Sequence, residues 1–290
     1  MSAPLSSTPM PVLFLGHGSP MNAIEDNAWS RSWHALGREL PRPRAILCVS
    51  AHWETPGPWL TGSAAPPTIH DFGGFPQALF DVQYPAPGLP ELAQEVADAI
   101  SPDRVGADLD GWGLDHGTWG VLVHAFPDAD IPVVQLSIDA RKPLDWHLQL
   151  GAKLAALRER GVLILGSGNV VHNLRAMDRH QPDGGFDWAQ RFDDAARALM
   201  TERPHDVPSL ASHRDYKLAV PTDEHFLPLL YVAGLASAAG KTTDVLVDGY
   251  ALGSLSMTAY TLQAHCPEAT GDGGGAAPID TTLPPEDANV

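Results

Sequence analysis

Cysteine is scarce in this chain of 290 residues, which contains only Cys48 and Cys266. Two cysteines cannot form a disulfide framework, and such scarcity is typical of proteins from a reducing compartment. Cys48 lies inside an apolar run, where a thiol packs as a small hydrophobic group. The opening residues also lack the basic stretch and apolar run of a secretory signal. We therefore expect a cytoplasmic protein.

Positive charge is scarce as well, since 18 Lys and Arg stand against 35 Asp and Glu, giving a net charge of −17. An acidic surface repels phosphate backbones and no run of basic residues occurs, so we expect no nucleic-acid partner. No segment reaches the roughly 18 apolar residues of a membrane span, so we expect no membrane partner either. Nothing in the sequence bears on the number of subunits.

Short apolar runs recur along the chain, and 44% of its residues are hydrophobic. These runs are continuous rather than alternating, which is typical of strands buried on both faces of a sheet. They cover residues 11–16, 45–50, 131–138, 162–168 and 244–249.

Stripes of apolar residues at helical spacing lie between these runs. The stripes are Leu89–Leu92–Val96–Ile100, Leu150–Leu154–Leu157, Phe186–Ala189–Phe192–Ala196–Leu199 and Phe226–Leu229–Leu230–Ala233. Alternating strands and helices predict an α/β fold, a three-layer sandwich with a mostly parallel or mixed central sheet and helices on both faces. The alternating residues 254–263 predict an antiparallel edge strand. We expect one domain over residues 1–265 and a disordered tail over residues 266–290.

Five histidines end apolar runs or lie beside glycine, namely His17, His52, His116, His172 and His225. Ligands of open α/β sheets bind at the carboxyl ends of the strands, so these residues are expected to meet there. Imidazole is a common ligand for iron, zinc and copper, and it transfers protons near neutral pH. A single such histidine is more often structural. No H-E-x-x-H or C-x-x-C motif occurs, so spacing alone does not specify a metal.

Six motifs occur in a characteristic order: FLGHGSPMNAI, SAHWE, HDFGGFP, LDHGTWG, GSGNVVHNL and DEHFLPLL. Over residues 12–262 the chain resembles the DODA-type class III extradiol aromatic ring-opening dioxygenases, the family of 4,5-DOPA extradiol dioxygenase. The resemblance implies a single catalytic domain. It also implies cleavage of a catechol-type aromatic, DOPA-like or related, with O2. The expected partners are therefore a small aromatic substrate and O2.

The resemblance also assigns roles to the histidines. It implies that His17, His52 and His225 bind a metal, and that His172 and His116 are acid/base groups. Asp223 and Glu224 are adjacent to the third position and could reach the metal instead. If a helix begins near His225, Asp223 can cap it and Glu224 should point away from His225, which favours the histidine.

Three neutral ligands suit Fe(II), which the resemblance implies for activity, and also Zn(II), which is expected as an alternative occupant in purified protein. His172 could then close a fourth position on zinc. Two other functions stay open: a non-enzymatic zinc-binding relative, and a zinc hydrolase with Glu54 or Glu224 as its base.

The segment 54–88 is rich in proline and glycine, and long irregular segments within a domain are usually functional. We expect it to form part of the substrate mouth, with His70 as a candidate substrate-binding residue. The sequence GSGN at 166–169 is too short for a dinucleotide motif. Ser19, followed by proline, fits the N-terminal cap of a helix better than a nucleophile.

Overall fold

The structure, a computed structural model, describes residues 8–264. The predicted tail at 266–290 lies outside the described residues. The helices are η1 (Pro20–Ala23), α1 (Ala28–Glu39), α2 (Gln77–Phe80), α3 (Pro90–Ile100), α4 (His116–Ala125), α5 (Leu144–Lys153), α6 (Ala155–Glu159), η2 (Leu174–Ala176), α7 (Asp187–Glu202), η3 (Pro204–Ser212), α8 (Tyr216–Ala219) and α9 (Leu227–Ala238). The strands are β1 (Val12–Gly16), β2 (Ala45–Glu54), β3 (Trp59–Thr61), β4 (Gly106–Asp108), β5 (Val133–Ile138), β6 (Val162–Gly168), β7 (Asp244–Val247), β8 (Tyr250–Ala251), β9 (Leu255–Ser256) and β10 (Ala259–Leu262).

An eight-stranded mixed sheet runs through the molecule in the order β4-β3-β5-β2-β6-β1-β10-β7. The four central strands β5, β2, β6 and β1 are parallel. At one side β10 pairs antiparallel with β1, and β7 pairs antiparallel with β10. Because parallel strands point their carboxyl ends to the same edge, β1, β2 and β6 deliver the residues that follow them to one place.

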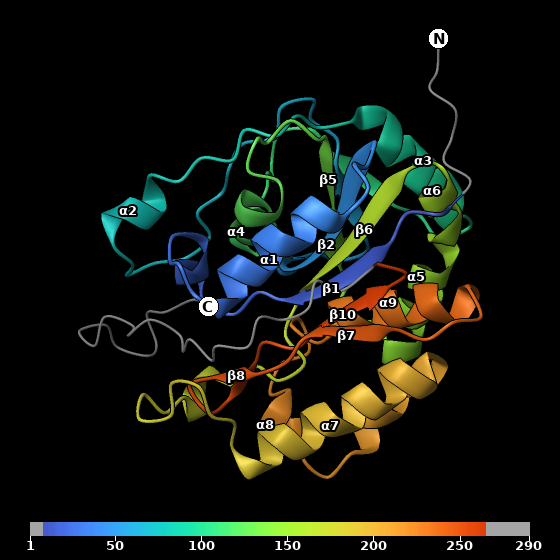
Figure 1. The fold of residues 1–290 in the computed structure, drawn as a ribbon. Coiled ribbons are helices and arrows are strands. Elements are labelled where there is room, and N and C mark those ends of the chain that lie inside the picture. Colours follow the sequence, from blue (N-terminus) through green and yellow to red (C-terminus); the bar gives the residue numbers. More distant parts are fainter. Residues whose placement is uncertain (1–7, 265–290) are drawn as a thin grey trace.

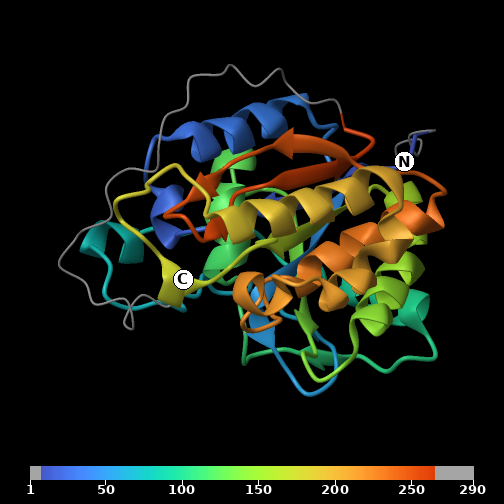
Figure 2. The same ribbon diagram turned by 90° about the horizontal axis from the view of Figure 1, so that it is seen from below.

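Alternate residues of each central strand enter different hydrophobic clusters. Val12 and Phe14 of β1 pack with helices α3, α5, α6, α7 and α9, whereas Leu13 and Leu15 pack with α1 and α4. Figures 1 and 2 show these two groups of helices on opposite sides of the sheet. The predicted three-layer α/β sandwich is therefore confirmed, and continuous apolar runs mark its doubly covered strands.

Two details at the carboxyl-terminal side of the sheet differ from the sequence predictions. The strand predicted within 254–263 is antiparallel as expected, but it is not at the edge, because β10 lies between β1 and β7. The strand at this edge of the sheet is β7. The apolar run 244–249 was expected to be buried on both faces, but the residues of β7 are partly buried or exposed. Alternation along 254–263 reports the two sides of a strand and carries no information about its neighbours.

Other local predictions match the structure. Ser19 caps η1, with its side chain accepting a hydrogen bond from the Met21 N–H and Pro20 at the first helical position. Cys48 is fully buried and accepts a hydrogen bond from the Thr118 hydroxyl at 3.2 Å. Within residues 8–264, no helix combines the length and the apolar character that crossing a bilayer requires.

Because the central strands are buried on both faces, shortening one of their side chains should lower the free energy of unfolding. Ile164 in β6 is fully buried and pairs with Val12 on one side and Leu47 on the other. We expect Ile164→Ala to lower the free energy of unfolding by about 2–5 kcal/mol, and Ile164→Val by about 0.5–1.5 kcal/mol. Urea denaturation followed by circular dichroism measures both. Equal losses for the two variants would contradict this packing.

Candidate active site

All five histidines singled out in the sequence converge at the carboxyl edge of the parallel strands. The ring centroids of His17 and His52 lie 4.9 Å apart, and that of His225 lies 5.3 Å from His17 and 4.9 Å from His52. His116 lies 3.9 Å from His52 between centroids, and His172 is stacked on His225 at 3.5 Å. The edge of the sheet thus gathers them from five widely separated parts of the chain.

The local structure places each histidine differently. His17 follows β1 directly, and Gly18 with φ of +57° lets the chain turn sharply after it. His52 does not follow its strand, as the sequence suggested, but lies inside β2, which continues to Glu54. His116 is the first residue of α4, and the backbone N–H of His172 donates to the Ala219 carbonyl at 2.8 Å.

His225 is placed by a close approach to the end of β6. The backbone N–H of Asn169 donates to the His225 carbonyl at 2.9 Å. A Cβ on Gly168 would collide with that same carbonyl oxygen, so glycine is required at 168. Gly168 of GSGN therefore serves the histidine cluster, consistent with the rejected dinucleotide motif.

Three oxygen acceptors orient three of the rings. The Ser167 hydroxyl donates to the Gly117 carbonyl, so its oxygen must accept from Nδ1 of His17, 3.0 Å away. This fixes the tautomer of His17 and leaves a lone pair on its Nε2. That atom lies 3.0 Å from Nε2 of His52.

Asp71 binds His116 twice. Its Oδ1 accepts from the backbone N–H and its Oδ2 from the ring Nδ1, both at 2.9 Å. Burial raises the pKa of Asp71, but its hydrogen bonds with His116 and the charge of that ring outweigh burial and leave the pKa below its ordinary value. An ionised carboxylate behind an imidazole fixes its orientation and stabilises its protonated form.

Glu224 lies behind His225 in the same way. Its Oε1 is 3.1 Å from Nδ1 of His225 and also accepts from the Thr222 hydroxyl at 2.7 Å. Burial raises the pKa of Glu224, but hydrogen bonding to His225 and Thr222 lowers it to about 2 overall. The sequence-based expectation that Glu224 points away from His225 is wrong, because α9 begins only at Leu227 and residue 225 is not yet helical.

The cluster is electrically suited to hold a cation. Burial lowers the pKa of His17 and His52 well below the ordinary value, and the neighbouring histidines lower both further. Burial also lowers the pKa of His225, although Glu224 opposes the shift. The three rings are therefore neutral at pH 7, which is the form that binds metals. Within residues 8–264, Nε2 of His225 and of His116 are buried without a hydrogen-bond partner.

Two separate sets of side chains could hold an ion. The possible ligand atoms of His17, His52 and His116 lie within 4.8 Å of one another, and so do those of His172, Glu224 and His225. The predicted trio His17, His52 and His225 draws from both sets, so the structure brings its members together without singling them out.

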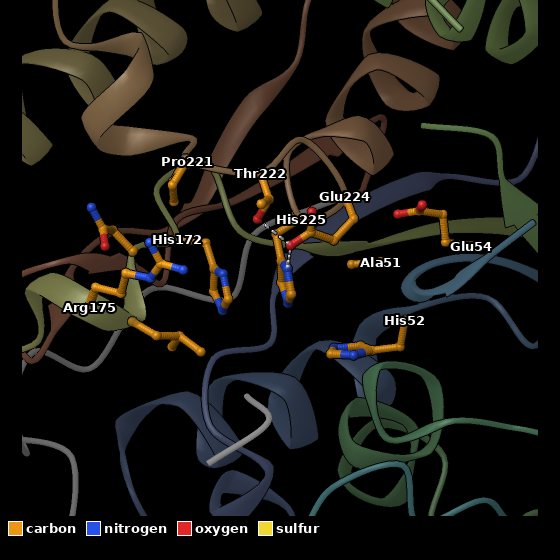
Figure 3. Close-up of a pocket in the computed structure, with 11 residues that line it drawn as sticks. Ala51, His52, Glu54, His172, Arg175, Pro221, Thr222, Glu224 and His225 are labelled. Atoms are coloured by element: carbon orange, nitrogen blue, oxygen red, sulfur yellow. Dashed lines mark hydrogen bonds and ion pairs between the residues drawn. The ribbon is translucent and has the colours of Figure 1, made fainter. Parts of the chain in front are cut away.

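A pocket of about 420 Å³ opens beside the cluster, a size within the range of small-molecule sites. Its lining is Ala51, His52, Glu54, His172, Asn173, Leu174, Arg175, Pro221, Thr222, Glu224 and His225. In Figure 3, His172 and His225 lie side by side and His52 lies across from them.

His70 lies apart from this lining. Its Nε2 is 2.9 Å from the Val82 carbonyl, and its ring packs against Phe72 and Trp119. Its predicted contact with substrate therefore stays a prediction. The same segment nevertheless reaches the cluster through Asp71, a role that the sequence did not reveal. The motif HDFGGFP marks Asp71, but only tertiary structure shows that it faces His116.

Neutral histidines backed by carboxylates beside a pocket, at the carboxyl edge of an α/β sheet, define an enzyme active site able to hold a metal ion. Residues 11–260 match the family described as the catalytic LigB subunit of aromatic ring-opening dioxygenase. The chain belongs to this family, and it is an extradiol ring-cleaving dioxygenase of the DODA type.

Individual relatives agree with this assignment. The chain is 52% identical to 4,5-DOPA dioxygenase extradiol of Escherichia coli K12, over 87% of this chain and 94% of that one. It is 36% identical to 4,5-DOPA dioxygenase extradiol of Beta vulgaris, over 85% and 94% of the two chains. The crystal structure of an uncharacterized E. coli K12 protein matches with a TM-score of 0.77 and 45% identity, covering 87% of this chain and 99% of that one.

The contact between Glu224 and His225 predicts the effect of removing the negative charge of Glu224. Carboxylates behind metal-binding histidines typically contribute about 10- to 100-fold to metal affinity, so we expect Glu224→Gln to weaken metal binding by that factor. Glu54→Gln is the matched control, because Glu54 lines the same pocket with no hydrogen bond to a histidine in the described residues. Titration against a competing chelator measures both. Equal affinities for the two variants would contradict a supporting role for Glu224.

Proposed function

We propose that this dioxygenase uses Fe(II), held by His17, His52 and His225, to cleave a catechol of the DOPA type. The convergence of five histidines beside one pocket carries the proposal. The names of the E. coli and Beta vulgaris relatives support DOPA as the type of substrate. Family membership favours ring cleavage over the alternatives of a non-enzymatic zinc protein and a zinc hydrolase.

The donor atoms fit such an ion. Nε2 of His17 is 3.0 Å from Nε2 of His52, so one ion could be bound by both nitrogens. The Glu224 contact leaves Nε2 of His225 as the third donor. Bound Fe(II) would coordinate the catechol oxygens and carry electrons between the ring and O2.

The remaining histidines move protons. Nε2 of His116 accepts a proton from a catechol hydroxyl, and the Asp71 carboxylate stabilises the resulting imidazolium. His172, at the pocket wall over His225, serves as the acid that assists ring opening. The carbon–carbon bond beside the two hydroxyl-bearing carbons breaks, and both atoms of O2 enter the product, a muconic semialdehyde. O2 is the only oxidant that this step needs.

Zinc suits the same nitrogens but has no redox chemistry, so the zinc-loaded protein is expected to be inactive. In that form His172 is close enough to His225 to act as a fourth ligand.

A direct assay tests the proposed reaction. Metal-stripped protein is loaded anaerobically with Fe(II) or Zn(II) and then exposed to DOPA and other catechols in air. We expect the iron form to consume one O2 per catechol and to form a yellow, ring-opened product, and the zinc form to do neither. Fully iron-loaded protein that consumes no O2 with any catechol would reject the proposal.

Single substitutions separate the two groups of histidines. We expect His17→Ala, His52→Ala and His225→Ala to lose bound metal, as measured by elemental analysis. His116→Ala and His172→Ala should keep the metal while kcat falls by about 100- to 10,000-fold, the usual contribution of general acids and bases.

His70→Ala is the control in this series. It should retain both the metal and kcat, and should raise KM if His70 contacts the substrate. Normal metal content in all three ligand variants would refute the assignment.

A further inference from the structure

The pocket beside the histidines is electrically asymmetric. Among the described residues that line it, Arg175, in η2, is the only lysine or arginine, while Glu54 and Glu224 supply two carboxylates. Figure 3 shows Arg175 on the His172 side of the pocket and Glu54 on the far side of Glu224 and His225. Arg175 and Glu54 therefore lie at opposite ends in the view of Figure 3, with Glu224 between them.

Arg175 has no acidic partner among residues 8–264, which is unusual for this chain. Most of the described arginines pair with a carboxylate, as Arg44 does with Glu95 at 2.9 Å and Arg191 with Asp215 at 3.0 Å. A chain of net charge −17 offers acids in excess. An exposed guanidinium in a pocket keeps five N–H donors for a ligand, in a planar arrangement that matches a carboxylate.

The other end of the pocket disfavours anions. Glu54 and Glu224 both line the pocket away from Arg175, so two acidic side chains face a ligand there. An anionic group on a substrate is repelled from these residues and attracted toward Arg175, and such complementarity governs orientation and specificity.

We propose that Arg175 binds a carboxylate on the side chain of the substrate, so that the enzyme selects catechols that carry an anionic side chain. The inference rests on the proposed function, in which the catechol oxygens lie at the histidine cluster. It adds a specificity residue three positions after His172, on the 3-10 helix that borders the pocket. DOPA, the compound in the names of the relatives, has such a carboxylate.

Anaerobic binding tests the role of Arg175 without turnover. The probes are 3,4-dihydroxyphenylacetate and its uncharged amide, which differ only in the carboxylate, and tryptophan fluorescence reports binding. We expect the wild type to prefer the acid by about 10-fold, since charge-assisted bidentate bonds in a partly desolvated pocket exceed an exposed ion pair. Arg175→Gln should abolish this preference and leave affinity for the amide unchanged, and Arg175→Lys should restore part of it.

Arg179→Gln is the matched control, because Arg179 is a nearby arginine outside the pocket lining, and it should keep the full preference. A preference that survives Arg175→Gln, or an equal loss of affinity for both probes, would overturn the inference. Failure of the iron-loaded wild type to consume O2 would reject the proposed reaction, while the comparison of acid and amide would still decide the role of Arg175. Absence of binding by both probes to the wild type would reject both.

Discussion

Hydrogen bonds to Nδ1 of three of the five rings determine what this site can do. Ser167 accepts from Nδ1 of His17, and Glu224 accepts from Nδ1 of His225. An imidazole that donates from Nδ1 presents a lone pair at Nε2, and burial keeps the ring from taking a proton there. The oxygen acceptors thus keep these histidines neutral, with a lone pair at Nε2 that can bind a metal ion. Metal binding at this edge of the sheet depends on those lone pairs.

The layered fold could be predicted from the sequence because a strand buried on both faces needs apolar residues at every position. The runs that became β1, β2, β5 and β6 are continuous and apolar, as two covered faces require. The position of β10 between β1 and β7 could not be predicted from the hydropathy of the sequence. Which strand lies at an edge depends on the partners that a strand finds, and hydropathy along one strand does not encode them.

The histidines of the site were predicted, but their supporting residues were not. The family motifs contain all five histidines. Asp71 and Ser167 also fall within these motifs, but a motif does not show which ring each side chain contacts. Each acts through a partner far away in sequence, as Asp71 does with His116. The orientation of Glu224 was predicted wrongly for a local reason, since a delay of two residues in the start of α9 changes which way the side chain points.

The approach of residue 225 to Gly168 has a consequence for how the chain is held together. His17 lies at the first strand and His225 just before the last long helix, so an ion bound to both would close a loop that contains most of the chain. A metal that binds these residues only in the folded protein stabilises the folded state by mass action, so its binding free energy adds to the free energy of unfolding. The proposed catalytic metal would then also be a cross-link, and occupancy of the site would influence the lifetime of the protein as well as its chemistry.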